Sequence, residues 1–429
     1  KEDTMIQVVG KENCCGCEAC VQSCPVHCIT MNEDNEGFLY PKVDEAKCLS
    51  CGLCNKSCPM LNNHVSIKPN TIYAGYNKDE QIRMDSSSGG FFTILAQVVL
   101  SNGGVVYGAM FDNNWMVVHG KIETMDDLYK IRKSKYVQSR IENCFKEIEQ
   151  LLKKGTPVMF SGCPCQVAGL KSYLKKEYQQ LFLVDFVCHG VPSPGIWNLY
   201  LKEFVENARK GENSVSSHSK PPISERDTLN ETNDVKIEGI SFRDKQLGWE
   251  KFSFALTLAK ASADGKKNTV SLSNIYINNP YMKGFIRNII LRPSCYSCKF
   301  KNFRSGADIT LADFWGVRKE FPDWNDDKGI GVAFINSDKE LFPYNKAVLR
   351  PVSLEQVLKY NPAIAKPSKL RRNRKLFYSY FNENDNISLT FALEKYSAWD
   401  IREQIRNLTI TILVNCGLID IVKKILNKS

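Results

Sequence analysis

From about residue 70 onward, short apolar runs alternate with amphipathic stretches. Stretches typical of strands occur at 105–111, 117–122, 181–187 and 331–335, and 181–187 has the apolar run of a strand buried in a parallel sheet. Stretches with the hydrophobic spacing of helices occur at 90–100, 141–153 and 166–174. Because strands alternate with helices, the pattern predicts a mixed α/β (α/β or α+β) body, with a mixed or parallel sheet covered by helices.

The pattern changes at both ends of this body and once within it. It predicts a small module at 1–65, a body in two parts at 70–208 and 237–360, a polar insertion at 209–236, and a helical tail at 365–429. No apolar run approaches the roughly 18–20 residues of a membrane helix, so we expect no transmembrane segment. The amphipathic stretch 408–426 leaves peripheral membrane contact open as an alternative role for the tail.

Cysteine and charge are distributed unevenly. Ten of the 17 cysteines fall in the first 60 residues, and the start of the chain is too polar for a signal peptide. Clustered thiols in a long chain favour metal binding in a reducing cytoplasm over a secreted disulfide scaffold. The first 60 residues hold five Lys and nine acidic residues, a net charge of −4, which leaves +14 on the remainder. That positive charge is scattered and accompanies no nucleic-acid-binding motif, so we expect charged protein partners rather than nucleic acid.

Eight of these cysteines form two identical runs with the spacing C-x2-C-x2-C-x3-C-P, typical of bacterial ferredoxins with two 4Fe–4S clusters. In such pairs the fourth cysteine of each run binds the other cluster. The predicted ligands of the first cluster are Cys14, Cys17, Cys20 and Cys58, and those of the second are Cys48, Cys51, Cys54 and Cys24. Zinc sites and a disulfide knot are less compatible with this spacing. Cys15 and Cys28 fall outside it and are interpreted as packing thiols.

A further set of cysteines lies in the body, after predicted strands or near a basic stretch. A third metal site would join Cys165, Cys188, Cys295 and Cys298. Inert buried thiols and a structural zinc explain the same residues, so the spacing leaves three interpretations open.

Other catalytic signals are weak. The segment 85–90 precedes an apolar helix and is either an anion cradle or an ordinary helix cap. No nucleotide-binding glycine fingerprint or Walker loop is present. Only His119 and His189 remain plausible for acid–base work, and no catalytic residue can be assigned. These features favour electron or hydride transfer by a bound cofactor.

Six motifs in chain order resemble one known family. They are 87–90 (SSGG), 134–136 (SKY), 162–166 (GCPCQ), 188–193 (CHGVPS), 295–299 (CYSCK) and 308–316 (DITLADFWG). Together with the cysteine runs, they resemble the coenzyme F-420 hydrogenase/dehydrogenase beta-subunit family, in its bacterial form with an N-terminal double 4Fe–4S ferredoxin module. The resemblance covers roughly residues 1–340.

The resemblance implies a third 4Fe–4S cluster and an FAD in the body. It suggests flavin contacts from Ser87, Ser88, Gly89, Gly90, Lys135, Tyr136, Gly162 and Pro164. Many relatives have Thr where this chain has Cys163, so either Cys163 or Cys165 is the fourth ligand.

The implied activity is an iron–sulfur flavoprotein oxidoreductase. It would pass electrons between the clusters and FAD and exchange hydride with a small substrate, either deazaflavin-like or a metabolite of polysaccharide synthesis. The expected protein partner is a ferredoxin or another oxidoreductase. Two alternatives remain, an electron-transfer adaptor without its own small-molecule substrate and a zinc-bearing scaffold. Substrate, direction of electron flow and oligomeric state are not predicted.

Overall fold

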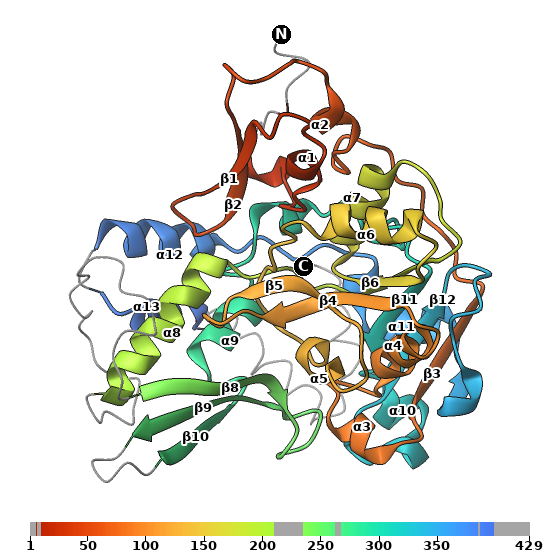
Figure 1. Cartoon of the computed structure of the whole chain (residues 1–429). Coiled ribbons are helices and arrows are strands. Elements are labelled where there is room, and N and C mark those ends of the chain that lie inside the picture. Colours follow the sequence, from red (N-terminus) through yellow and green to blue (C-terminus); the bar gives the residue numbers. More distant parts are fainter. Residues whose placement is uncertain (1–5, 7–9, 210–234, 262–266, 385–386, 399–429) are drawn as a thin grey trace, which may run out of the picture.

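The computed structural model describes residues 6, 10–209, 235–261, 267–384 and 387–398 (Figure 1). Nearly all of the predicted polar insertion at 209–236 and the amphipathic stretch 408–426 lie outside the described residues. No helix of the described part is long and apolar enough to cross a bilayer.

An eight-stranded mixed sheet forms the centre of the body, which confirms the predicted fold class. Its order is β13-β3-β12-β11-β7-β6-β4-β5. The strands are β3 (Thr71–Asn77), β4 (Val105–Phe111), β5 (Val117–Ile122), β6 (Val158–Ser161), β7 (Leu181–Phe186), β11 (Ile309–Asp313), β12 (Gly331–Ile335) and β13 (Ala347–Pro351). The central strands β11, β7, β6 and β4 are parallel, and the outer pairs are antiparallel. These parallel strands therefore deliver their carboxyl ends to one edge of the sheet.

Helices cover both faces of this sheet because successive strand residues point to opposite sides. Phe160 packs with α6 (Cys144–Lys153) and α7 (Pro164–Leu174) on one face. Met159 packs with α4 (Phe91–Ser101) on the other face. Short helices α3 (Glu80–Met84), α5 (Leu128–Ile131), α10 (Val317–Glu320) and α11 (Leu354–Tyr360) lie in the connections.

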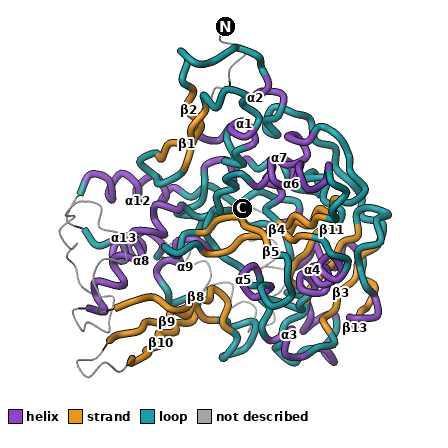
Figure 2. Tube along the Cα trace, viewed as in Figure 1, coloured by secondary structure: helices purple, strands orange, loops and turns teal. Residues whose placement is uncertain are grey.

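A second body layer combines a three-stranded antiparallel sheet with four helices (Figure 2). The strands are β8 (Val235–Asp244), β9 (Ser253–Ala261) and β10 (Lys267–Ile275). The helices are α8 (Pro194–Arg209), α9 (Pro280–Ile286), α12 (Arg372–Glu383) and α13 (Leu389–Ser397). Their shared core is aromatic and includes Trp197, Phe254, Tyr281 and Phe377. The described part of the tail thus packs within the body.

The cysteine-rich module lies at one end of the molecule, where the N-terminal residues are drawn in red (Figure 1). It consists of the hairpin β1 (Ile29–Glu33) and β2 (Leu39–Val43) with two one-turn helices, α1 (Ala19–Gln22) and α2 (Leu53–Lys56). It packs against the body beside α6 and α7.

Polar contacts fix the module on the body. The Glu18 carboxylate accepts hydrogen bonds from the amides of Ile141 and Glu142, both at 3.0 Å. The Gln22 side-chain oxygen accepts from Phe145 at 3.0 Å. Amides at the start of α6 that have no partner within the helix are thereby satisfied by module side chains. The hairpin turn approaches α8 so closely that a Cβ on Gly37 would lie 2.7 Å from the Gly195 Cα.

Candidate functional site

The two cysteine runs fold into loops of the same backbone shape. Gly16 and Ser50 occupy equivalent positions with φ of +68° and +52°. Glu18 and Gly52 are also equivalent, with φ of +61° and +68°, and each precedes a one-turn helix. In each loop, the residues with left-handed backbone curve the chain around the space in front of its three cysteines. The two runs therefore share backbone conformation as well as cysteine spacing.

The first group of cysteines, here called site one, comprises Cys14, Cys17, Cys20 and Cys58. Burial raises the pKa of Cys20 well above its ordinary value, and the charges of Cys14 and Cys58 raise it further. Burial also raises the pKa of Cys58, to about 11. The electrostatic coupling shows that the fourth cysteine of the second run lies beside the first run, as the exchange of ligands between runs requires.

The second group, site two, comprises Cys24, Cys48, Cys51 and Cys54. All four line one cavity, which holds about 340 Å³ of space including its open mouth. Cys51 is exposed at this cavity, so site two lies close to solvent. Cys28 also lines the cavity, and its sulfur is 3.4 Å from that of Cys24. The thiol interpreted from sequence as a packing residue is thus buried but belongs to the cavity lining.

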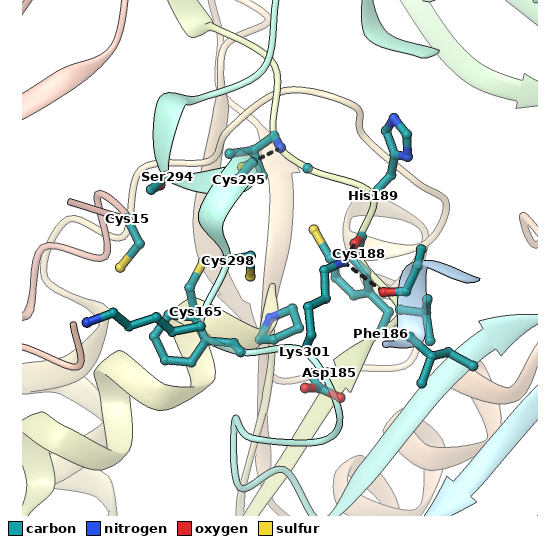
Figure 3. Close-up of a pocket in the computed structure, with 18 of the residues that line it drawn as sticks. Cys15, Cys165, Asp185, Phe186, Cys188, His189, Ser294, Cys295, Cys298 and Lys301 are labelled. Carbon is teal, nitrogen blue, oxygen red and sulfur yellow. Dashed lines mark hydrogen bonds between the residues drawn. The ribbon is translucent and has the colours of Figure 1, made fainter. Parts of the chain in front are cut away.

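The third group, the body site, comprises Cys165, Cys188, Cys295 and Cys298. All four line one cavity, which holds about 730 Å³ of space including its open mouth (Figure 3). Cys165 follows β6 and Cys188 follows β7, and these neighbouring parallel strands end at the same edge of the sheet. The short 3-10 helix Pro293–Ser297 brings Cys295 and Cys298 to the same edge. Sheet topology therefore gathers cysteines that are about 130 positions apart in the chain.

Cys163 and Cys165 have different environments. Cys163 is the N-cap of α7, and its sulfur accepts from the amide three residues later. Cys163 is buried next to Cys188 and is not one of the residues that line the body cavity. Cys165 lines the cavity itself. Cys163 interacts electrostatically with Cys188, Cys295 and Cys298, and Cys165 interacts with Cys298 and Cys15, so both thiols lie beside the other body cysteines.

Helix α7 connects the body site with site one. Cys165 lies in its first turn, and a Cβ on Gly169 would be 3.0 Å from the sulfur of Cys17. Cys15 lies between the two sites, because the thiols of Cys165 and Cys17 are the neighbours that lower its pKa most. It also lines the body cavity, so this second packing thiol lies at the junction. Cys165 and Gly169 are about one helical turn apart in α7, an axial rise of about 5.4 Å.

Each of the three cysteine groups offers four thiols, the number that a 4Fe–4S cluster binds. No three His, Cys, Asp or Glu side chains in the described ranges converge closely enough to hold one metal ion. A single zinc would bring its four sulfurs to about 2.3 Å from the metal, and a four-iron cubane would hold them farther apart. Burial raises the pKa of Cys295 to about 12, so a bound cation is needed to keep such a thiol ionised.

The residues suggested to contact flavin fall into two places. The Ser87 hydroxyl accepts from the Ser134 amide at 2.7 Å and so joins its loop to Lys135 and Tyr136. The Ser88 hydroxyl donates to the Ile330 carbonyl at 3.0 Å. A Cβ on Gly89 would lie 2.5 Å from the Gly75 carbonyl oxygen. Gly90 has φ of +86° and begins α4. The loop therefore uses its serines and glycines to pack against β3 and β12.

Lys135 and Tyr136 directly follow Ser134, which the loop 87–90 contacts through Ser87. The Lys135 ammonium donates to the Arg132 carbonyl at 2.9 Å, and burial lowers its pKa to about 7. Tyr136 stacks on Phe285 with ring centroids 4.6 Å apart, and Phe285 meets His189 edge to face at 5.2 Å. Since His189 follows Cys188, two aromatic rings connect Tyr136 with the body site.

A buried polar group beside Tyr136 was not predicted from the sequence. Arg243 pairs with Asp313 at 2.7 Å, yet the Arg243 Nε and one Asp313 oxygen have no hydrogen-bond partner among the described residues. The buried Trp249, whose Nε1 also lacks one, stacks on Trp315 at 4.7 Å. These buried polar atoms are free to hydrogen-bond a bound polar group or water.

The remaining predicted positions lie nearer the body site. Pro164 lines its cavity, whereas Gly162 is buried, with its Cβ position 3.2 Å from His119 Nε2. Both ring nitrogens of His119 are engaged, with Ser161 at 3.0 Å and Ser139 at 2.8 Å. Burial lowers the pKa of His119 to about 4, so it is a neutral structural residue at pH 7.

Comparisons with known proteins agree with this geometry. Residues 155–352 match the family model that describes the C terminus of the coenzyme F420 hydrogenase/dehydrogenase beta subunit. Residues 13–62 match a 4Fe-4S dicluster domain. The resemblance to the coenzyme F420 hydrogenase/dehydrogenase beta-subunit family is confirmed. The family segment contains all four cysteines of the body site and begins just before β6.

One similar solved structure is a chain from the F420-reducing [NiFe] hydrogenase complex of Methanosarcina barkeri, studied by xenon derivatization. It is 17% identical, with a TM-score of 0.41, and the alignment covers 75% of this chain and 95% of that chain. No curated protein matches the sequence. The two family-model matches make the chain an iron–sulfur protein related to the coenzyme F420 hydrogenase/dehydrogenase beta subunit.

Proposed function

We propose that this protein is an iron–sulfur flavoprotein oxidoreductase with three 4Fe–4S clusters and one FAD. Clusters carry single electrons, and FAD pairs them for hydride exchange. The observation that carries the proposal is the convergence of Cys165, Cys188, Cys295 and Cys298 on one cavity beside site one.

The positions of the chain's own residues support a continuous redox path. Exposed Cys51 places site two at the surface, while α7 holds site one against the body site. Beyond the body site, Phe285 and Tyr136 lead toward Arg243 and Asp313. Short spacing between redox groups is the arrangement that electron transfer through protein requires.

The proposed flavin region lies between the loop 87–90 and the Arg243–Asp313 pair. Lys245 donates to the Ser88 carbonyl at 2.9 Å and so holds that loop next to β8. Tyr136 and Trp315 offer aromatic faces, and the unpartnered Arg243 Nε offers a donor. These groups would bind and orient the ring system and exclude water from it.

The proposed substrate is a small hydride acceptor or donor, deazaflavin-like or a polysaccharide-pathway metabolite, and the proposed partner is a ferredoxin or other redox protein. A second candidate function is an electron-transfer adaptor without a substrate of its own. It is favoured by the serine hydroxyls of the loop 87–90, which already have protein partners. The expected cytoplasmic location stays a prediction.

Iron and FAD per chain, measured on protein purified without oxygen, separate these functions. About 12 irons with one FAD supports the oxidoreductase, because three four-iron clusters then accompany a flavin. About 8 irons without flavin contradicts it and leaves an adaptor carrying two clusters.

A pair of cysteine variants tests the body site directly. Cys188→Ser should lower iron from about 12 to about 8 per chain, because each 4Fe–4S cluster holds four irons. Cys144→Ser is the matched control, since Cys144 is a buried thiol that donates to the His119 carbonyl away from the cavity. Equal iron in both variants would rule out a cluster at the body site.

A further inference from the structure

Arg292 is a fully buried cation at the junction of module and body. Its side chain is 1% exposed, and it precedes the 3-10 helix that carries Cys295 and Cys298. Its Nε donates to the Cys14 carbonyl at 2.7 Å, and one terminal nitrogen donates to Gln138 Oε1 at 2.9 Å. The other terminal nitrogen reaches the Leu39 carbonyl at 2.9 Å and the Cys14 sulfur at 3.4 Å.

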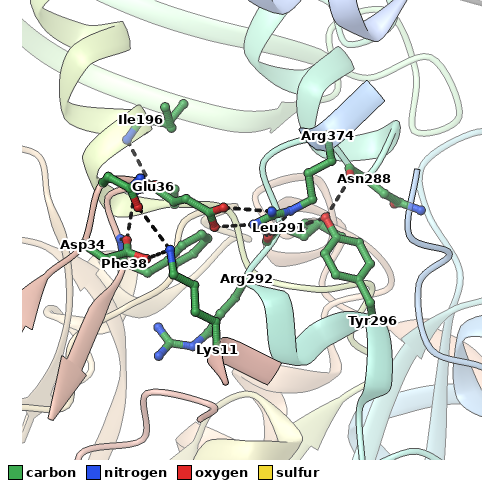
Figure 4. Close-up of polar contacts among 12 residues, drawn as sticks. Lys11, Asp34, Glu36, Phe38, Ile196, Asn288, Leu291, Arg292, Tyr296 and Arg374 are labelled. Carbon is green, nitrogen blue, oxygen red and sulfur yellow. Dashed lines mark hydrogen bonds and ion pairs between the residues drawn. The ribbon is translucent and has the colours of Figure 1, made fainter. Parts of the chain in front are cut away.

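None of these contacts supplies a carboxylate. The nearby acidic side chains of the hairpin are already paired, Asp34 with Lys11 and Glu36 with Arg374, both at 2.5 Å (Figure 4). The rings of Phe38 and Tyr40 enclose the guanidinium at 5.5 and 4.3 Å. Neutral carbonyls, one amide and aromatic rings do not balance a buried charge, and an unpaired buried charge is strongly destabilising.

The sulfur of Cys14 is therefore the decisive contact. A thiolate bound to a four-iron cluster belongs to an anion, and the guanidinium faces it directly. We propose that Arg292 is the buried counter-ion of the cluster at site one and raises the reduction potential of that cluster. This inference rests on the proposed function, because it requires a cluster at site one.

The direction of the effect follows from charge. Reduction adds one negative charge to the cluster, and a fixed cation with an N–H aimed at sulfur stabilises the reduced form more than the oxidised form. At site two, the sulfurs of Cys24 and Cys48 accept from the backbone amides of Cys28 and Ser50, both at 3.4 Å. The two loops have the same backbone, so Arg292 distinguishes two otherwise similar sites.

The test is a redox titration of the holoprotein followed by electron paramagnetic resonance, with Arg292→Gln and Arg292→Lys. Arg292→Gln should lower the midpoint potential of one cluster clearly more than those of the others, and Arg292→Lys should lower it less because the charge remains. Arg374→Gln is the control, since this buried arginine pairs with Glu36 at the same junction rather than facing a cysteine sulfur, and it should shift the potentials less than Arg292→Gln. An unchanged potential in Arg292→Gln would overturn the proposal.

If Arg292→Gln fails to hold the cluster at site one, the iron content of the two variants provides the test. Loss of about four irons in Arg292→Gln but not in Arg292→Lys supports a charge requirement, because only lysine keeps the positive charge. Equal loss in both variants would overturn the proposal in favour of packing alone. Failure of the proposed function is distinguishable, since the unmodified protein would then lack the cluster signals before any variant is compared.

Discussion

Replacing Gly169 with Ala tests the contact between α7 and site one. The new methyl group would lie 2.9 Å from the Cys17 Cβ and 3.0 Å from its sulfur, and the Phe145 ring would be 3.6 Å away. The first two distances are shorter than normal carbon contacts, so either the helix or Cys17 has to move. Because Cys17 is a proposed ligand, movement there should disturb the cluster of site one.

Two opposing energies set the size of the effect. Alanine in a helix is favoured over glycine by about 0.5–1 kcal/mol. Overpacking a closed core costs about 1–3 kcal/mol. We therefore expect a net destabilisation between about 0 and 2.5 kcal/mol, with the local change directed at Cys17 rather than spread through the body.

The assay combines iron content, electron paramagnetic resonance and the thermal unfolding midpoint. Gly169→Ala should change the signal of one cluster or lower iron toward about 8 per chain, because four irons leave together. Gly239→Ala is the matched control, since its Cβ would meet only Thr257 at an ordinary 3.7 Å. Higher thermal stability with unchanged iron and signals in Gly169→Ala would refute the reasoning.

Three further predictions concern other parts of the path. Cys51→Ser should lower iron by about four per chain while FAD stays bound, because Cys51 lies at the exposed end of the module; loss of flavin in the same variant would contradict this. Leu49→Asp should slow reduction of the protein by a soluble reduced ferredoxin roughly tenfold, because Leu49 is 64% exposed beside site two. Leu370 is similarly exposed, and Leu370→Asp should leave this rate unchanged. Stopped-flow absorbance measures both rates. Burial raises the pKa of Asp185 from 3.8 to about 7, so its carboxyl group stays protonated in the fold at pH values where the unfolded chain ionises it. Asp185 should cost up to about 4 kcal/mol of stability as pH rises from 4 to 7, and thermal unfolding of Asp185→Asn should lack this slope; parallel profiles would reject the assignment.

Local pattern was sufficient for much of the fold. The stretches predicted as strands at 105–111, 117–122 and 331–335 coincide with β4, β5 and β12, because β-branched and aromatic residues are enriched in them. The ferredoxin spacing was also sufficient, since each loop closes within about ten residues. The strand β11 was not predicted, although it lies within the motif 308–316, because its polar ends interrupt the apolar signal.

Long-range partners explain what the sequence left open. Arg292 contacts Cys14 and Leu39, about 250 to 280 positions away in the chain, so no spacing around it indicates a role. The sequence around Cys15 likewise indicates an ordinary packing thiol. In the fold, Cys15 lies beside Cys165, which is 150 positions away in the chain. The Arg243–Asp313 pair joins β8 and β11, from two different sheets. In each case the signal is a three-dimensional neighbour.

The internal repeat of the module has a kinetic consequence. Cys15 and Met60 face the body, while the equivalent positions in the other half, Leu49 and Val26, are exposed. In the proposed redox path, the half with Cys15 and Met60 is held against the body within one chain. Electron transfer between that half and the body therefore needs no diffusion and does not depend on protein concentration. The exposed half, with Leu49 and Val26, still meets a separate redox partner by diffusion. Dilution and added salt should therefore slow only the bimolecular step, and the internal step should keep a constant first-order rate.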